Sequence, residues 1–342
     1  MITVEFGLDT FGDVTVDDKG KSLPYAQVIR NVVDQAILAE QVGLDGFGVG
    51  EHHRDDFAVS APEIVLAAIA GRTERIKLST AVTVLSSDDP VRVYERFATL
   101  DAVSRGRAEI ILGRGSFTES FPLFGFDLND YEKLFAEKAE LMTALLDEGP
   151  VTWSGTVRPP LKNQHVYPKT ESGHIRTWIG VGGSPESVVR AAQLGLPLVL
   201  AIIGGEPARF APYVELYHRA LKEFGHEQLP VAVHCPGFVA DTDEEAVETL
   251  WPHARNMLNR IGRERGWQPM AKGQFEKDVR DGAWHVGSPS TVAAKVARTI
   301  QALGIQRFDL KYSAGTLPHD KMLKAISLYG TEVLPQVRSL LA

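Results

Sequence analysis

Short apolar runs alternate with longer segments of helical periodicity along almost the whole chain of 342 residues. A strand followed by a helix and another strand favours parallel pairing, because the helix returns the chain to the starting edge of the sheet. Eight such runs predict eight parallel strands, at residues 2–8, 44–49, 76–82, 107–112, 177–181, 198–203, 231–239 and 306–311. Eight is the strand number of a (β/α)8 TIM barrel. We therefore expect one barrel domain over residues 1–342.

A doubly wound open sheet is the alternative fold for the same alternation. The dinucleotide-binding fingerprint G-x-G-x-x-G would favour that fold, but it does not follow the first predicted strand. Helical periodicity predicts helices at 25–42, 61–71, 91–103, 131–147, 185–194, 208–224, 244–261, 291–303 and 321–341. The barrel explains this order better than the open sheet does.

Two segments interrupt the alternation. Residues 151–168 contain a glycine and three prolines, and they predict an irregular hairpin inserted after the fourth helix. Residues 262–284 are charged and only weakly periodic, and they predict a loop insertion before the last helix–strand units.

Composition excludes several classes of protein. The formal net charge of −8 and the lack of a Lys/Arg run argue against nucleic-acid binding. Cys235 is the single cysteine, so neither an intrachain disulfide nor a cysteine zinc site can form. The first residues lack the charged-then-apolar order of a signal peptide, and no apolar run reaches the roughly 18 residues of a membrane span. We expect a cytoplasmic protein without membrane association.

The end of the second predicted strand carries Glu51, His52 and His53. Histidine changes charge near neutral pH, so it suits proton transfer, and active sites of barrels lie where the strands end. One packed and one solvated histidine is the structural alternative. A metal site is the other alternative, but adjacent residues of an extended strand point to opposite faces and do not chelate one ion. We expect no metal.

The fifth predicted strand runs into Gly182, Gly183, Ser184 and Pro185. Serine is a good helix N-cap and proline suits the first helical position, so a helix begins here. The free N–H groups of such a helix start favour a phosphate, although the pattern also describes a merely well-capped helix. The same pattern recurs at residues 286–289, and we prefer the first because its strand is more apolar.

Arg114 follows the apolar run of the fourth predicted strand and lies between Gly113 and Gly115. The planar guanidinium group suits phosphate recognition at the end of a strand. A structural ion pair with a neighbouring carboxylate is the alternative.

Taken together, these motifs resemble the bacterial luciferase-like flavin monooxygenases. The resemblance runs in the same order through nearly the whole chain, over residues 51–53, 80–85, 89–92, 100–107, 113–115, 181–187 and 289–310. Each motif is short, and their joint occurrence carries the assignment. The chain departs from luciferase itself at Gly113, where luciferase has a cysteine, and at Gly183, where it has an acid. The resemblance therefore implies the broad family and not light emission.

The resemblance implies a barrel that binds reduced FMN at its rim as a cosubstrate. The phosphate would lie between Arg114 and the backbone of Gly183 and Ser184, with Ser187 assisting. Ala81 and Val82 match a pair under the isoalloxazine ring that the family joins by a cis peptide bond. The implied cofactor-binding residues are Ala81, Val82, Arg114, Gly115, Val181, Gly182, Gly183, Ser184 and Ser187.

The implied reaction is monooxygenation of a small organic substrate by O2 through a flavin hydroperoxide. His52 matches the family's proton-transfer residue, and His53 and Glu51 would orient or line the site. A separate NAD(P)H-dependent flavin reductase is the implied partner, and the family analogy implies a homodimer. The alternatives are a deazaflavin-dependent dehydrogenase of the same superfamily, a flavin-binding protein without turnover, and a metal-dependent hydrolase.

Overall fold

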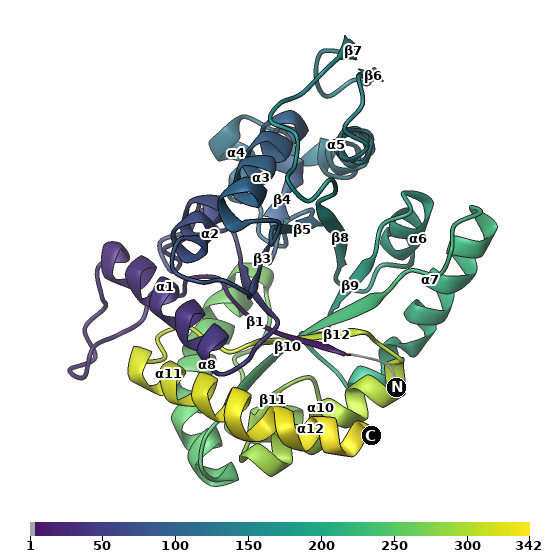
Figure 1. Ribbon diagram of the computed structural model, residues 1–342. Helices are drawn as coiled ribbons and strands as arrows, with labels where there is room; N and C mark the ends of the chain where they lie inside the picture. The colour runs from purple at the N-terminus through teal and green to yellow at the C-terminus, as the bar shows by residue number, and fades with distance from the viewer. Residues whose placement is uncertain (1–3) are drawn as a thin grey trace.

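A computed structural model describes residues 4–342 as an α/β barrel of parallel strands surrounded by helices (Figure 1). The barrel strands are β1 (Glu5–Thr10), β2 (Gly46–Val49), β3 (Lys77–Thr80), β4 (Thr83–Val84), β5 (Glu109–Gly113), β8 (Arg176–Val181), β9 (Leu198–Ala201), β10 (Val231–Val239) and β12 (Arg307–Lys311). β3 and β4 follow each other along one strand path, so the eight predicted strands are confirmed. The predicted start of the first strand, at residues 2 and 3, lies outside the described residues.

The strand order around the barrel is β3-β2-β1-β12-β10-β9-β8-β5-β4. The path closes because β3 meets the start of β5: the Leu78 amide donates to the Arg107 carbonyl at 2.9 Å, and Leu78 forms a parallel bridge with Ala108. An open doubly wound sheet has two free edges and is therefore excluded. A further short strand, β11 (His285–Gly287), pairs with the far end of β10.

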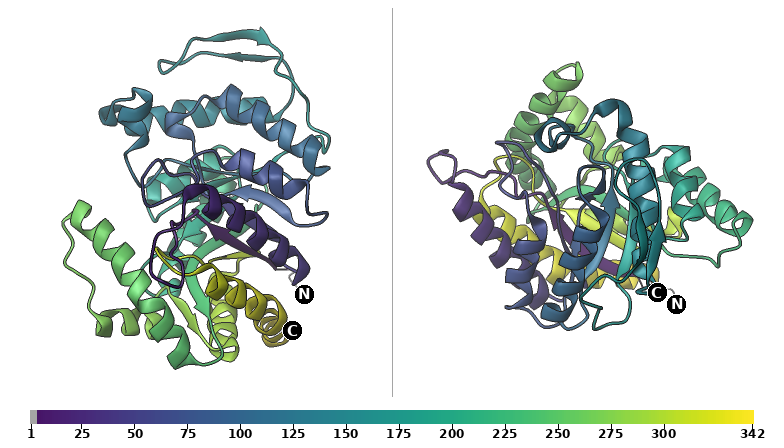
Figure 2. Two further views of the ribbon diagram at one scale, coloured as in Figure 1. Left: turned by 90° about the vertical axis from the view of Figure 1, so that its left-hand side faces the viewer. Right: turned by 90° about the horizontal axis from the view of Figure 1, so that it is seen from above.

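Helices cover the outside of the barrel, as Figure 2 shows from two further directions. They are α1 (Tyr25–Gln41), α2 (Pro62–Ala70), α3 (Pro90–Ser104), α4 (Ser120–Phe124), α5 (Tyr131–Leu146), α6 (Pro185–Gln193), α7 (Ala211–Glu223), α8 (Asp243–Arg265), α9 (Lys272–Asp281), α10 (Pro289–Leu303), α11 (His319–Leu328) and α12 (Leu334–Leu341). A π-helical turn, Tyr329–Val333, joins the last two helices. The single helix predicted at 321–341 is therefore one continuous helical segment with a π-helical turn in its middle.

The predicted hairpin at 151–168 is confirmed. β6 (Val151–Trp153) and β7 (Leu161–Gln164) pair antiparallel and project away from the barrel in Figures 1 and 2. The prediction of a loop at 262–284 is wrong for most of that segment, because α8 continues to Arg265 and α9 follows. The apolar signal of α9 is one buried side chain, Phe275, which packs between Trp251 and Trp284 at 5.3 Å from each ring. One anchor is too few to produce a visible helical period.

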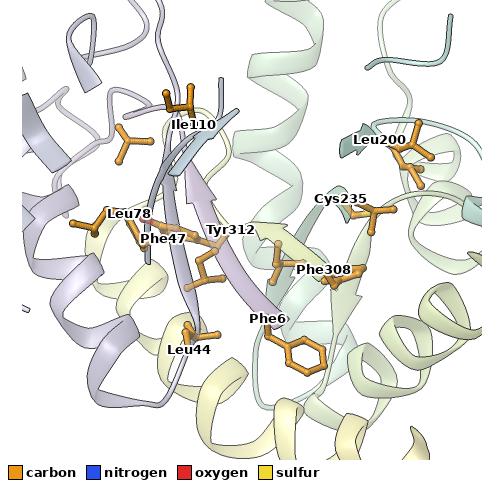
Figure 3. Close-up of a cluster of buried hydrophobic side chains, with 14 of the residues drawn as sticks. Phe6, Leu44, Phe47, Leu78, Ile110, Leu200, Cys235, Phe308 and Tyr312 are labelled. Carbon is orange, nitrogen blue, oxygen red and sulfur yellow. The ribbon is translucent and has the colours of Figure 1, made fainter. Parts of the chain in front are cut away.

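Strand residues alternate between the outside and the inside of the barrel. Outward side chains such as Phe6, Phe47, Leu78 and Phe308 belong to the large hydrophobic core between strands and helices (Figure 3). A separate, smaller apolar cluster joins Ile111, Trp178, Val199 and Ala232, with Val82 packed against it. These residues come from four consecutive members of the barrel, β5, β8, β9 and β10, so they fill its interior.

A buried ion network also crosses the barrel interior. Arg307, only 3% exposed, donates through Nε to Asp309 Oδ2 at 2.9 Å and pairs with Glu109. Glu109 lies on β5 and Arg307 on β12, which are not neighbours in the sheet, so this contact spans the inside. A Cβ atom at Gly7 would lie 2.0 Å from Asp309 Oδ1. Gly7 on β1 therefore leaves the space that the Asp309 carboxylate occupies.

Replacement of Arg307 tests how much this network contributes to the free energy of unfolding. Arg307→Met leaves the Glu109 and Asp309 carboxylates buried without their cation, so we expect a loss of about 3–5 kcal/mol in the free energy of unfolding. Urea denaturation measures it. Arg92→Met is the matched control, because the Arg92 side chain is 75% exposed and its loss should change stability by less than about 0.5 kcal/mol. Equal stability of the two variants would contradict a role for the network.

Candidate functional site

The chemistry-bearing strand ends lie together at one end of the barrel, which we call the mouth. The parallel register aligns Thr10 of β1 with Val49 of β2, and Val49 with Thr80 of β3. Val84 of β4 is aligned with Gly113 of β5. The segments after these residues therefore emerge at the same edge. The mouth brings together the predicted motifs at residues 51–53, 81–82, 113–115 and 181–187.

The peptide bond between Ala81 and Val82 is cis, and it lies between β3 and β4. Glycines on the neighbouring strands leave room for this dipeptide. A Cβ atom at Gly113 would lie 2.4 Å from Val82 Cγ2, and one at Gly48 would lie 3.2 Å from the Ala81 Cβ. Any side chain at position 113 would therefore collide with Val82, so glycine has a packing reason at this position.

Glu51 connects the histidine motif to the strand beyond the cis bond. Its Oε2 accepts a hydrogen bond from the Val84 backbone N–H at 3.0 Å, and its Oε1 lies 2.8 Å from His53 Nε2. The Glu51 residue is 8% exposed. Both oxygens of this buried carboxylate are therefore engaged, and Glu51 fixes the His53 ring against β4.

His52 lies in a nest of aromatic rings. The ring centres of Phe57, Phe11 and Phe117 lie 4.3, 5.0 and 5.0 Å from its own. His52 Nδ1 lies 3.7 Å from Glu119 Oε1. Burial is the largest single influence and would raise the pKa of the Glu119 carboxyl, but the contact with His52 and the backbone N–H groups of Glu119 and His53 together outweigh it and hold that pKa below its ordinary value. His52 therefore has an apolar surround and one carboxylate neighbour, which the sequence analysis did not identify.

We expect Glu51→Ala to lower the free energy of unfolding by about 1–3 kcal/mol, because the buried Val84 N–H loses its acceptor. Glu51→Gln keeps an acceptor oxygen for that N–H and should cost less. Thermal or urea unfolding measures both. The control is Glu227→Ala, an exposed glutamate, and a Glu51→Ala protein as stable as this control would show that the bridge carries no weight.

Two arginines meet at one exposed carboxylate beside α6. Arg114 pairs with Glu132 Oε1, and Arg190 Nη2 donates to Glu132 Oε2 at 3.0 Å. The ion-pair alternative for Arg114 is thus present in the structure, but the Glu132 side chain is 60% exposed and such pairs are weak. Sequence reasoning missed Arg190, although its spacing of three from Ser187 on a helix places both on one face. We call Arg114, Arg190 and the start of α6 the cationic cradle.

The start of α6 is built as the sequence predicts. Ser184 caps the helix, accepting from the Ser187 N–H at 3.3 Å, and Gly183 has φ +107°, a conformation that glycine tolerates. Ser184 Oγ also donates to Glu186 Oε2 at 2.7 Å. The Ser187 Oγ and Arg190 Nη1 atoms are buried and have no hydrogen-bond partner within residues 4–342. Two unsatisfied donors beside a helix N-terminus match an anion site.

The second helix start with this pattern differs in one decisive contact. At α10 the Asp243 carboxylate accepts from the Ser288 N–H at 2.6 Å and from the Thr291 hydroxyl at 2.9 Å. A carboxylate of the chain itself therefore takes the place that an anion would take. The structure thus supports the preference for the start of α6.

The end of α8 reaches over the mouth. Arg54 donates to both carboxylate oxygens of Glu264, at 2.5 and 2.8 Å, and Arg265 Nη2 donates to the Ser116 carbonyl at 2.9 Å. The guanidinium carbons of Arg54 and Arg265 lie 4.5 and 5.3 Å from the centre of the Phe117 ring. Part of the segment predicted as a loop therefore packs around Phe117, one of the three rings beside His52.

Comparison with known proteins decides the family. The sequence model of the luciferase-like monooxygenases matches residues 5–307. The chain belongs to this family. A luciferase-like relative, the alkanal monooxygenase alpha chain of Aliivibrio fischeri, is 26% identical over 323 residues, which cover 86% of this chain and 89% of the relative.

Solved structures of other proteins share the fold. The oxygenating constituent of 3,6-diketocamphane monooxygenase from Pseudomonas putida, in complex with FMN, gives a TM-score of 0.79 at 20% identity and covers 97% of this chain and 98% of that one. The coenzyme F420-dependent tetrahydromethanopterin reductase from Methanopyrus kandleri gives 0.75 at 21% identity, with 97% and 99% covered. The luciferase-like chain is an oxidoreductase, and it shares its barrel fold with an FMN-bound monooxygenase and with an F420-dependent reductase.

Within residues 4–342, none of the helices combines the length and apolar character needed to cross a membrane. The same range contains no group of three or more His, Cys, Asp or Glu side chains placed to hold a metal ion.

Proposed function

We propose that this luciferase-like protein is a monooxygenase that uses reduced FMN and O2 to oxidise a small organic substrate. The observation that carries the proposal is the mouth itself, where a cationic cradle, the Ala81–Val82 dipeptide and an aromatic-lined histidine share one rim. These are the parts needed to bind a phosphate, support a flat ring and move a proton.

The residues present fit the phosphate of FMN. Arg114 and Arg190 supply guanidinium groups, and the buried Ser187 hydroxyl, unsatisfied in the part of the chain that the structure describes, supplies a further donor. The helix dipole of α6 adds a favourable field for a dianion. Gly182 leaves open space where a Cβ would be, so the backbone can be approached closely. Reduced FMN, when bound, supplies the two electrons that activate O2.

The chain's own residues have separate tasks in this proposal. Ala81 and Val82 support the flavin ring, while Gly115 and Val181 border the phosphate cradle. His52 moves a proton at the reacting edge of the ring, and the surrounding phenylalanines exclude water from it. Glu51 and His53 hold the histidine motif against β4.

The second candidate is a dehydrogenase that depends on a deazaflavin such as F420, because an F420-dependent reductase has the same fold. That enzyme class would transfer a hydride without O2. A flavin-binding protein without turnover is the third. We further propose a separate NAD(P)H-dependent flavin reductase as the source of reduced FMN, and a homodimer.

Titration of the protein with FMN and with F420, each oxidised and anaerobically reduced, tests the proposal. We expect reduced FMN to bind more tightly than oxidised FMN and more tightly than either form of F420. Quenching of tryptophan fluorescence measures the four dissociation constants. Tighter binding of F420 would favour the dehydrogenase, and equal binding of both FMN forms would favour the non-catalytic binder.

The phosphate role predicts a selective loss. We expect Arg114→Ala and Arg190→Ala each to weaken FMN binding by about 10- to 100-fold, since a hydrogen bond to a charged group contributes about 1.5–3 kcal/mol. Riboflavin, which lacks the phosphate, should bind each variant as it binds the original protein. Arg92→Ala on α3 is the control. An equal loss for both ligands would remove the phosphate role.

The proton-transfer role predicts the opposite pattern for His52. We expect His52→Ala to keep the affinity for FMN within about threefold, because the cationic cradle is intact. The rate at which oxidised flavin returns after mixing with O2 should change by about 10- to 100-fold, which lies at the lower end of the usual contribution of general acid–base catalysis. Stopped-flow absorbance measures that rate. His174→Ala, an exposed histidine, is the control. An unchanged rate would reject the assignment.

A further inference from the structure

A histidine–aspartate pair, His234 and Asp9, lies inside the barrel and is separate from the histidine motif at residues 51–53. His234, in the middle of β10, places Nδ1 at 2.7 Å from Oδ2 of Asp9, which lies near the end of β1. In the sheet β12 separates these two strands, so the contact spans the inner face of β12. Asp9 is 3% exposed, and the His234 side chain is 12% exposed. Asp9 is thus buried, while His234 keeps a small part of its side chain exposed.

Each member of this pair keeps one polar atom without a contact. Asp9 Oδ1 is buried and has no hydrogen-bond partner in the described range 4–342. In the same range His234 makes its side-chain hydrogen bond through Nδ1, which leaves Nε2 available. A buried carboxylate oxygen without a donor costs about 1–3 kcal/mol or more, so such an arrangement calls for an explanation. A ligand hydroxyl beside this pair would meet two acceptors without a donor, Asp9 Oδ1 and His234 Nε2.

Phe11 joins this pair to the mouth. Its ring is stacked on His234 with a centroid distance of 6.0 Å and an angle of 4°, and it meets His52 edge-on at 5.0 Å. The two histidines therefore lie on either side of one phenylalanine. A purely structural ion pair would not need to lie beside the residue that the proposed function uses for proton transfer.

We propose that His234, oriented by Asp9, is a second proton-transfer residue and that it accepts the proton of a weakly acidic hydroxyl on a planar apolar substrate, a phenol. The inference rests on the proposed monooxygenase function. Phe11, Phe57 and Phe117 provide flat apolar contacts for the body of such a substrate. The imidazole provides the base, and Asp9 stabilises the imidazolium that forms.

The proton balance is closed. The substrate O–H bond breaks, its proton goes to His234 Nε2, and the electron pair stays on the phenolate oxygen, which makes the ring more nucleophilic. One oxygen atom of O2 enters the ring and the other leaves as water, while reduced flavin supplies two electrons and two protons. His234 then returns its proton to the phenolate of the product. The sum is substrate, O2 and reduced flavin giving hydroxylated product, water and oxidised flavin.

Charged and titratable groups face this pair from several elements. Asp9 belongs to β1, His52 follows β2, and Asp309 of β12 is the register partner of His234. Lys311 Nζ, also from β12, lies 4.6 Å from the centre of the Phe11 ring. A pH profile of the intact site would mix these titrations, so the test reads the ionisation of a probe rather than of the protein.

The probe is 4-nitrophenol, whose phenol and phenolate forms absorb at different wavelengths. It is titrated into the protein, with and without FMN, at a pH below its own pKa. We expect the original protein to bind the probe as phenolate. His234→Gln should lower the phenolate absorbance of the bound probe by about tenfold or more, as the loss of a charged hydrogen bond implies. Asp9→Asn, which keeps the imidazole, should lower it less.

His174→Gln is the matched control, because it removes an exposed histidine and should bind the probe as the original protein does. FMN titration of each variant shows whether it is folded. If His234→Gln does not fold, Asp9→Asn decides. An unchanged phenolate signal in the folded variants, or no binding of the probe by the original protein, overturns the inference. If reduced FMN still binds more tightly than oxidised FMN, that outcome overturns only this inference. If it does not, the proposed function is overturned as well.

Discussion

A buried guanidinium must be surrounded by carboxylates, and Arg307 finds one on its own strand and another across the barrel on β5. This contact fixes β12 relative to the opposite wall and requires glycine at position 7 on β1. The strand register that follows aligns the carboxyl ends of the strands at one rim. Every feature of the mouth depends on that alignment, because its parts come from at least five strands.

Glu51 positions parts of the mouth in the same way that the buried charges position the barrel strands. One oxygen holds the Val84 backbone, which follows the Ala81–Val82 bond, and the other holds His53. The backbone that would support a flat ring and the histidine motif are therefore positioned by a single carboxylate. The end of α8 adds an outer support through Arg54, Arg265 and the ring of Phe117.

The sequence predicted the eight strands and most of the helices because their apolar periodicity is strong and their caps are clear. It failed at α9, where Phe275 is the only buried side chain, and at the end of α8, where the predicted helix stopped at residue 261 although ion pairs beyond that point hold the helix. Local pattern placed Arg114 directly after a strand and Ser184 at a helix N-cap, as the structure has them. It missed Arg190, Glu119 and the Asp9–His234 pair, because each contacts a residue from a distant part of the chain that only the folded structure brings close.

The central claim is that reduced FMN at this mouth reacts with O2 in a way that the protein controls. The most direct measurement is stopped-flow absorbance after the anaerobic complex of protein and reduced FMN is mixed with oxygenated buffer. We expect a transient absorbance, distinct from both reduced and oxidised FMN, that precedes the return of oxidised flavin. Direct reoxidation at the rate of free reduced FMN, with no such transient, would contradict it.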